Sequence, residues 1–365
     1  MNSLHADLAA HEDWLRGLCD VDEAALTLKH ARMAENPAAF LRGAFPRWAR
    51  TVLDHLPHLR QSPASLSVCD AHLENFGVWR DAEGRLAWGV NDFDEAAMAP
   101  ALLDLVRLAV SVRVAEITGK PVPGEAEATL LEGYQRGLVD PQPVILQDRH
   151  LDLRKAVTVS EKRRRAFCRR LDDVEPAVPP WRARNGLRYA LPKGSTDEVY
   201  GAWRQGLGSL GRRRYLVIAA WRGGPVVREA RALVPSAWGW THGGVQSRSE
   251  FMAVAAGPHR CPDPFLRVEQ GYVIRRIAPD SRKIEFGDKG LERFGGDLLA
   301  LMGAELAAIH AARPQAAAAI LRDLASRPPT WLTEATDVME ETVRTDHSAW
   351  AANPTLPKRL QNSGR

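Results

Sequence analysis

The sequence has few cysteines and no long apolar segment. Its four cysteines, Cys19, Cys69, Cys168 and Cys261, are spread over 365 residues and form no Cys-x-x-Cys pair. This spacing argues against a disulfide framework and against a compact zinc site. No stretch approaches the roughly 18 apolar residues of a membrane span, and the N-terminus lacks the basic and apolar regions of a secretion signal. We therefore expect a cytoplasmic protein with no membrane partner.

The excess of one sign of charge over the other is also small. The chain has 49 Lys and Arg residues against 45 Asp and Glu residues, a formal net charge of +4. The sequence pI near 9.0 reflects a local excess in residues 161–170, EKRRRAFCRR. Such a run is usually the solvated face of a helix and less often a phosphate or nucleic-acid contact. Nucleic-acid binding would need further basic or aromatic residues on the same surface, and we do not expect it.

The remaining composition is that of a globular protein long enough for two domains or two lobes. Apolar residues recur at helical spacing in several segments. The clearest predicted helices are residues 101–116, 124–139, 151–171 and 298–312. Asp104 and Arg107 lie three apart on the first of these helices, so they face the same side. His310, near the end of the last, is expected to cap or pack rather than to bind a ligand.

The most informative segment is residues 68–108. Asp70, His72 and Asn75 lie in one short polar turn, two apolar runs separated by the sequence DAEG follow, and the segment continues with NDFDE. This order predicts a loop, a hairpin and a second, acidic loop. Because antiparallel strands return the chain to its starting point, the oxygen-bearing side chains of the two loops should lie together.

The chemistry of these two loops suits phosphoryl transfer. Clustered Asp and Asn oxygens are typical ligands of magnesium. The spacing from Asp70 to Asn75 is also that of the kinase catalytic loop, in which the Asp takes a hydroxyl proton and the Asn holds a metal. Two alternative roles for these side chains stay open. Asp and Asn are common in turns for local hydrogen bonding. The other alternative is that Cys69, Asp70 and His72 are scattered zinc ligands, although no second Cys or His pair completes such a site.

A glycine-rich segment, GLGSLG at residues 206–211, precedes a run rich in Tyr, Val, Ile and Trp. In a dinucleotide-binding fold such glycines open a helix, whereas in a kinase they lie between two strands and cover the phosphates. The strand-like run favours the kinase arrangement. A tight hairpin turn with no ligand is the alternative.

In a kinase, the third strand carries a Lys that pairs with a Glu on the next helix. Arg228, within VVREA, stands at the matching place, and Glu250, within SRSEFMAVAAG, is the best helix carboxylate. An Arg keeps the charge, although its planar head is not equivalent to an ammonium. Glu250 can equally be an exposed helix residue.

These motifs resemble the aminoglycoside phosphotransferase branch of the protein-kinase fold, but in rotated order. More narrowly, the chain resembles the bacterial family called domain of unknown function 2252. The matching motifs are FxRG at residues 40–43, DxHxxNFG at 70–77, NDFDE at 91–95, PxxxDLxRL at 100–108 and GxGSxG at 206–211. The chain departs from that family at Cys69, where Gly is typical, and at Arg228, where Lys is usual.

The resemblance implies an α+β, two-lobed, kinase-like fold that is circularly permuted, with the catalytic-loop lobe first. The implied regions are residues 1–190, a helical lobe with the catalytic loop and metal-binding hairpin, residues 191–285, a β-rich nucleotide-binding lobe, and residues 286–365, helices that complete the first lobe. Short distances between termini make such permutations tolerable.

The resemblance also implies residue roles. Asp70 would be the catalytic base and His72 a member of the catalytic group that orients the loop. The implied metal ligands are Asn75, Asp92 and Asp94, the last as a direct ligand or a carboxylate behind it. The implied nucleotide-binding residues are Gly206, Gly208, Ser209, Gly211, Arg228 and Glu250. Asp104 and Arg107 are expected to hold the catalytic loop to the following helix.

The expected function is an ATP- and magnesium-dependent phosphotransferase acting on a small-molecule acceptor. One alternative is a pseudokinase-type module that binds nucleotide or a partner without transfer. Another is nucleotidyl transfer by the same fold. The feature that distinguishes an active phosphotransferase from a pseudokinase is whether Arg228 can replace the usual Lys.

Overall fold

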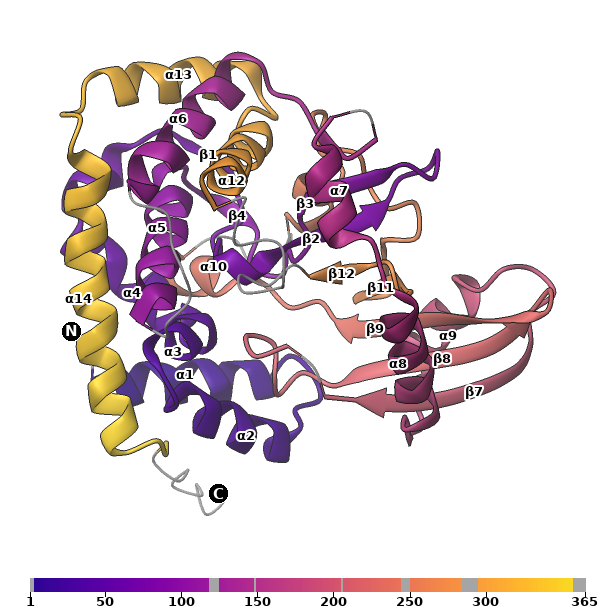
Figure 1. The fold of residues 1–365 in the computed structure, drawn as a ribbon. Helices are drawn as coiled ribbons and strands as arrows, with labels where there is room; N and C mark the ends of the chain where they lie inside the picture. The colour runs from indigo at the N-terminus through magenta and orange to yellow at the C-terminus, as the bar shows by residue number, and fades with distance from the viewer. Residues whose placement is uncertain are drawn as a thin grey trace.

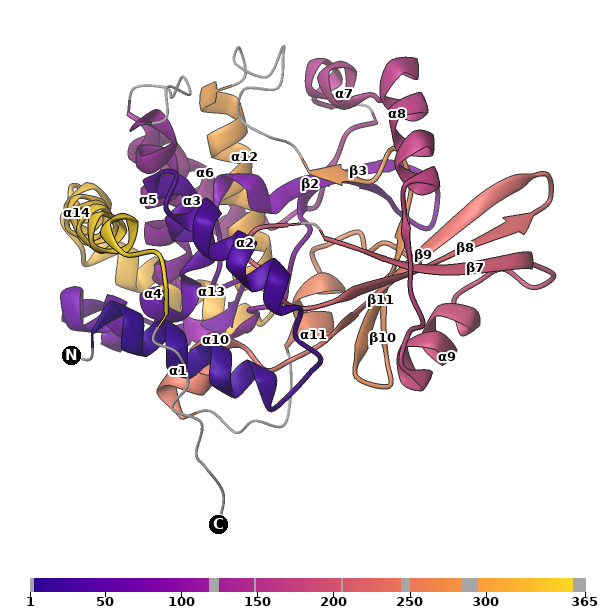
Figure 2. The same ribbon diagram turned by 90° about the horizontal axis from the view of Figure 1, so that it is seen from below.

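The computed structural model describes residues 3–117, 125–147, 149–204, 206–243, 250–283 and 295–356. A mainly helical body and a twisted antiparallel sheet lie side by side (Figures 1 and 2). The α+β class expected from the sequence is thus confirmed. None of the helices in the described ranges is both long and apolar enough to cross a membrane.

Helices are more common than strands among the described residues. The α-helices are α1 (Leu4–Arg16), α2 (Glu23–Met33), α3 (Pro37–Gly43), α4 (Phe45–His55), α5 (Leu102–Ile117), α6 (Ala126–Val139), α7 (Leu151–Val157), α8 (Glu161–Asp172), α9 (Trp181–Tyr189), α10 (Ala237–His242), α11 (Phe251–Ala255), α12 (Gly295–His310), α13 (Pro314–Ala325) and α14 (Trp331–Ala352). Short 3₁₀ turns, η1 (Pro57–Gln61) and η2 (Leu73–Asn75), interrupt the loops.

The strands form three antiparallel sheets among the described residues. The largest has the order β10-β11-β9-β8-β7-β6, the second β12-β2-β3-β5, and the third pairs β1 with β4. Their bounds are β1 (Ala64–Ser67), β2 (Phe76–Arg80), β3 (Leu86–Val90), β4 (Ala97–Pro100), β5 (Val144–Ile145), β6 (Glu175–Pro176), β7 (Thr196–Trp203), β8 (Arg214–Trp221), β9 (Gly224–Ala232), β10 (Arg267–Glu269), β11 (Tyr272–Ile277) and β12 (Arg282–Lys283).

The predicted hairpin of the central segment is confirmed as β2 and β3. Its turn is built by Asp81, whose Oδ1 accepts hydrogen bonds from the backbone N–H groups of Glu83 at 3.0 Å and Arg85 at 2.9 Å. Gly84 completes the turn with a φ of 74°, a value that glycine adopts without strain. The local chemistry of DAEG therefore returns β3 alongside β2 and brings the two ends of the hairpin together.

The main hydrophobic core joins the two ends of the chain. It contains Leu8 from α1, Leu306 from α12 and Trp350 from α14. A separate small core, which includes Leu187 of α9 and Ile274 of β11, lies on one face of the large sheet. The C-terminal helices α12 and α14 therefore share one core with the N-terminal helix α1.

The boundaries of the sheet region differ from the predicted ones. Both α9 and β6 pack with the sheet, so this region begins before residue 190. Trp238 of α10 and Phe251 of α11 belong to the main core instead, although both fall within the predicted β-rich region. The boundary predicted at residue 285 lies outside the described residues.

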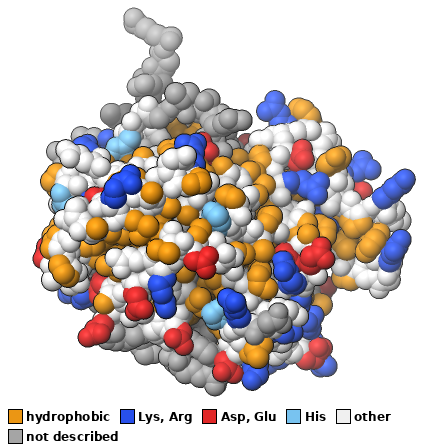
Figure 3. Space-filling model, turned by 90° about the horizontal axis from the view of Figure 1, so that it is seen from above, with side chains coloured by type: hydrophobic (Ala, Val, Ile, Leu, Met, Phe, Trp, Pro, Cys, Tyr) orange, Lys and Arg blue, Asp and Glu red, His pale blue; other side chains and the backbone are white. Residues whose placement is uncertain are grey.

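The basic helix predicted over residues 151–171 is two helices, α7 and α8. Ser160 ends the continuity, because its side chain accepts a hydrogen bond from the backbone N–H of Arg163 at 3.4 Å and caps α8. A serine in this position favours a helix start over helix continuation. Basic and acidic side chains are interspersed over the face of the molecule in Figure 3, as the small net charge suggests.

Candidate active site

A cleft of about 1060 Å³ brings together segments that are far apart in the sequence. Asp92 from the acidic loop and Gly206 from the glycine loop both line it. A side-chain carbon added at Gly208 would lie 3.2 Å from the Arg42 carbonyl oxygen and 3.8 Å from Asp70 Oδ2. The glycine loop therefore lies directly over Asp70, although more than a hundred residues separate the two segments in the chain.

The loop that carries Asp70 is clamped to α5. Asp104 Oδ2 accepts a hydrogen bond from the backbone N–H of Val68 at 2.7 Å, and its Oδ1 accepts one from Cys69 at 2.8 Å. His310 Nε2, from α12, lies 3.0 Å from Asp104 Oδ2. Asp104 is buried, so these contacts are shielded from water. The structural role expected of Asp104 and the packing role expected of His310 are both confirmed.

Cys69 has a φ of 63°, in the left-handed region that favours glycine. A residue with a side chain pays about 1–2 kcal/mol there. This conformation is the physical reason why glycine suits the position. In this chain the contact of the Cys69 N–H with Asp104 holds the strained residue in place. Burial also raises the pKa of the Cys69 thiol.

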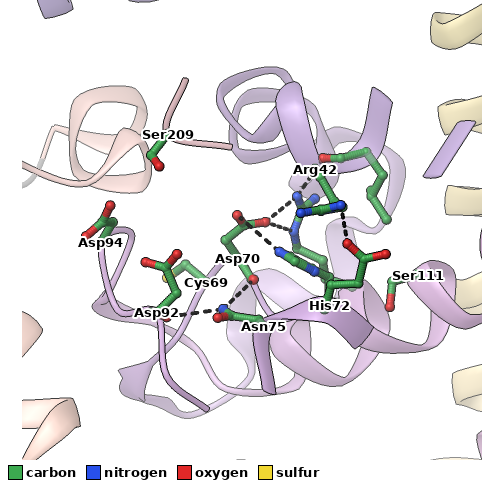
Figure 4. A network of polar contacts seen from close by, with 12 residues as sticks. Arg42, Cys69, Asp70, His72, Asn75, Asp92, Asp94, Ser111 and Ser209 are labelled. Atoms are coloured by element: carbon green, nitrogen blue, oxygen red, sulfur yellow. Dashed lines mark hydrogen bonds and ion pairs between the residues drawn. The ribbon is translucent and has the colours of Figure 1, made fainter. Parts of the chain in front are cut away.

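Asp70 lies at the centre of the site, with Ser209, Asp92 and Asp94 on one side in Figure 4. Its Oδ1 accepts hydrogen bonds from Arg107 Nε at 2.8 Å and Nη2 at 2.5 Å. Burial raises the pKa of Asp70, and Arg107 opposes that shift. Arg107 thus binds Oδ1, while Oδ2 faces the glycine loop. This arrangement leaves Oδ2 in a position to accept a proton.

His72 is buried beside this carboxylate. Its Nε2 lies 4.0 Å from Asp70 Oδ2, beyond hydrogen-bond distance. Leu73, the next residue, donates its backbone N–H to Ser111 Oγ at 3.0 Å. His72 therefore packs within the loop, a position that suits orientation of the loop better than reaction with a substrate.

Asn75 joins the two polar loops. Its Nδ2 donates to the carbonyl oxygens of Asp70 and Asp92, each at 3.1 Å. Its Oδ1 is buried and has no hydrogen-bond partner in the described part of the chain. A buried oxygen without a donor suits a cation. The hydrogen bond from Nδ2 also holds the backbone of Asp92, a residue that lines the cleft, beside Asn75. The described residues contain no group of three His, Cys, Asp or Glu side chains that could hold a metal, so Asn75 and Asp92 would need further oxygens from a ligand or water.

Asp94 does not fit the role of a direct metal ligand. Its Oδ2 pairs with Arg212 Nη2 at 2.5 Å and its Oδ1 with Arg231 Nη2 at 2.5 Å. Both oxygens therefore already bind guanidinium groups, and two adjacent positive charges disfavour a dication. The contacts fit the alternative role given for Asp94 in the sequence analysis, that of a carboxylate behind the metal ligands. In that position Asp94 binds Arg212 and Arg231.

The glycine loop joins β7 to β8, so its predicted position between two strands is confirmed. Gly206 has a φ of 73° and Gly211 a φ of 103°, and a side chain at Gly211 would collide with Leu26. Ser209 Oγ points inward and accepts hydrogen bonds from Arg214 Nη2 at 2.5 Å and Arg231 Nη1 at 3.1 Å. The loop is thus held against α2 on one side and against buried arginines on the other.

Arg228 does not line the cleft, contrary to the sequence prediction. Its Nε donates to the Ala190 carbonyl at 2.9 Å, and its guanidinium lies 5.0 Å over the Phe265 ring. Successive side chains of a strand point to opposite faces, and Arg228 falls on the face that α9 covers. No ion pair joins it to Glu250 among the described residues, and Glu250 instead precedes α11 as its N-cap residue. The predicted pairing of these two residues is therefore wrong.

Sequence reasoning missed the arginines that do face the site. Arg231, three residues after Arg228, contacts both Asp92 at 3.4 Å and Asp94. Glu229, on the same face of β9, accepts from Arg214 at 2.7 Å and Arg275 at 2.8 Å. The signal that could have found them was the alternation in REAR, which places the first Arg on one face of the strand and Glu229 with Arg231 on the other.

Glu95 gives the site a testable pH dependence. Burial raises its pKa from the ordinary 4.5 to about 7, against the opposing effects of Arg212 and of the Ala237 N–H that donates to Oε2 at 2.7 Å. The folded state therefore holds a proton that the unfolded state releases, so the stability contributed by Glu95 is complete below pH 4.5 and is lost as pH rises to about 7.

We expect Glu95→Gln to flatten this part of the curve of unfolding free energy against pH, because Gln resembles the protonated side chain. Urea unfolding at intervals between about pH 4.5 and 8 measures the curve. Glu132→Gln, a change of the same chemistry at an exposed position, is the control. An unchanged slope in Glu95→Gln would contradict this assignment.

Comparison with known proteins supports part of the resemblance. Residues 21–136 match the family model described as "Uncharacterized protein conserved in bacteria (DUF2252)". The matched segment includes Asp70, Asn75 and Asp92 and ends before the glycine loop. No curated protein and no solved structure matches the chain. The likeness to this family therefore rests on residues 21–136, which are less than half of the chain.

Proposed function

We propose that the protein is an ATP- and magnesium-dependent phosphotransferase with a small-molecule acceptor, built on a circularly permuted kinase-like fold. The observation that carries the proposal is the Asn75 bridge, in which one amide group binds the carbonyls of both Asp70 and Asp92 beneath the glycine loop. The backbone at the proposed proton acceptor and the backbone at the proposed metal-binding carboxylate are thus held together by one side chain. In phosphoryl transfer, the protein contributes mainly by holding such groups in position, because it forms no covalent bond that the reaction depends on.

In this proposal Asp70 accepts the proton of the acceptor hydroxyl. Burial raises its pKa, which favours proton uptake, while Arg107 fixes its orientation through Oδ1. Asn75 and Asp92 would hold magnesium, which supplies positive charge to the phosphates. Arg107 itself is fully buried and also donates to the Leu41 carbonyl at 2.8 Å, so the carboxylate is anchored to α3 as well as to α5.

Buried arginines on the sheet would bind the phosphates. Burial and the neighbouring Arg231 lower the pKa of Arg214 to about 10, which indicates crowded positive charge. An anion at this point would relieve that repulsion. Apolar side chains of the cleft, which would suit a nucleotide base, include Val78, Val90, Leu266 and Ile277.

A second candidate is nucleotide binding without transfer. The observation that favours it is the pairing of Arg231, which contacts Asp92 and Asp94 instead of a helix carboxylate. A metal ligand already paired with an arginine would bind magnesium less readily. Nucleotidyl transfer is the third candidate, and its released product, pyrophosphate instead of ADP, identifies it.

The test is a thermal-shift titration of nucleotides with and without magnesium, on wild type and two variants of β9. We expect Arg231→Met to weaken nucleotide affinity roughly tenfold to a hundredfold, the usual value of a hydrogen bond to a charged group. Arg228→Met, a matched change on the covered face of the same strand, should leave affinity unchanged. Mass spectrometry of the products then separates ADP, pyrophosphate and no turnover. A larger loss of affinity in Arg228→Met, or no nucleotide binding by wild type, would overturn the proposal.

A further inference from the structure

The cleft is richer in positive charge than the nucleotide site alone accounts for. Its lining includes eight arginines and four carboxylates. The arginines are Arg32, Arg42, Arg163, Arg170, Arg214, Arg260, Arg275 and Arg276. On the sheet side, Glu229 already pairs with Arg214 and Arg275. The helix side carries a second group, Arg32, Arg42, Arg163 and Arg170 from α2, α3 and α8. In this group Arg42 pairs with Glu74, which also lines the cleft.

Helix α8 presents one face to the cleft. Arg163, Ala166, Phe167 and Arg170 line it, and their spacing places them on one side of a helix. The guanidinium of Arg170 lies 5.0 Å over the Trp203 ring, a contact that covers its flat face. Phe167 and Leu171 pack against the sheet and hold α8 in this orientation. Figure 2 shows α8 beside the sheet strands.

Several guanidinium groups of the cleft have buried donors without acceptors. In the described part of the chain, Arg42 Nε and both Nε and Nη2 of Arg276 have no hydrogen-bond partner. Arg214, with a side chain only 4% exposed, has an unpartnered Nε as well. A buried donor without an acceptor is unfavourable, so these groups favour a ligand rich in anionic oxygens. The cleft, at about 1060 Å³, also slightly exceeds the roughly 300–1,000 Å³ of a single small-molecule pocket.

We propose that the acceptor is itself an anion, bearing phosphate or carboxylate groups, and that Arg163 and Arg170 of α8 with Arg42 of α3 hold it beside the nucleotide. This inference rests on the proposed function. In the reaction the acceptor hydroxyl oxygen bonds to the γ-phosphorus, the bond from that phosphorus to the bridging oxygen breaks with its electron pair on ADP, and the hydroxyl proton passes to Asp70. Cationic acceptors would be repelled by the same arginines.

The test uses the full chain saturated with magnesium and a non-hydrolysable ATP analogue, so that the nucleotide phosphate site is filled. Inorganic phosphate, citrate and, as a neutral comparison, glucose are then titrated by calorimetry. We expect phosphate or citrate to bind and glucose not to bind. The stronger of the two anions identifies the class of charged group.

The paired variants are Arg163→Glu/Arg170→Glu and Lys162→Glu/Arg169→Glu. The second pair has the same spacing and the same change of charge, but neither residue is among those that line the cleft. We expect the first pair to weaken anion binding roughly tenfold to a hundredfold and the second less than about twofold. Absence of anion binding to the saturated protein, or equal loss in both pairs, would overturn the inference.

The nucleotide affinity, measured first, separates this inference from the proposed function. If the analogue does not bind, the proposed function fails. Phosphate titration of the nucleotide-free protein, with the same two pairs of variants, then shows whether α8 forms an anion site by itself. If the analogue binds and the α8 variants change nothing, only the inference about the acceptor fails.

Discussion

Asp92→Ala is expected to abolish magnesium-dependent nucleotide binding, whereas Asp70→Asn should leave binding nearly intact and stop transfer. A metal ligand acts on the bound ground state, while a base acts on the acceptor hydroxyl during reaction. Calorimetry with the non-hydrolysable analogue measures binding, and ADP release with an identified acceptor measures transfer.

The choice of substitutions follows from the neighbours of each carboxylate. Asp70 faces the fully buried Arg107, and removal of the whole carboxyl group would leave a buried charge unpaired, at a cost of about 3–5 kcal/mol. Asn keeps an oxygen acceptor for that guanidinium. Asp92→Ala leaves Arg231 paired with Asp94 at 2.5 Å, so this arginine is not left without a partner. Equal loss of nucleotide binding in both variants would contradict the two roles.

Asp104→Ala is expected to lower the free energy of unfolding by roughly 2–6 kcal/mol, because two buried N–H groups lose their acceptor at about 1–3 kcal/mol each. Those groups belong to Val68 and Cys69, so the loop that presents Asp70 should loosen. His310 loses its carboxylate partner in the same variant. Urea unfolding measures the loss.

The control for this prediction is Asp152→Ala, which removes a carboxylate from an exposed helix position with a single lysine contact. Its effect should stay within about 0.5 kcal/mol, as is usual for surface substitutions. Asp104→Asn is an informative intermediate, since its side chain can accept from only one of the two N–H groups. A loss no greater than that of Asp152→Ala would show that the clamp contributes little.

Much of the local structure followed from the sequence. The turn residues of DAEG predicted the β2–β3 hairpin, and the β-rich run after GLGSLG predicted a glycine loop between two strands. The spacing of Asp104 and Arg107 predicted that both face the same side of a helix, and both contact the loop that carries Asp70, through Cys69 and Asp70. In each case the structure depends on neighbours in the chain, so short patterns carry the information.

The remaining features depend on segments that are distant in the chain. Alternation along β9 implies that Arg228 and Arg231 lie on opposite faces, but the packing of α9 decides which face is covered. Asp94 is a local neighbour of Asp92, yet its role follows from Arg212 and Arg231, more than a hundred residues later. The sequence by itself determined which residues carry acid, amide and guanidinium groups and on which elements they lie. Tertiary packing decided which of those groups meet, because they are buried and paired only when the sheet packs against the helical body.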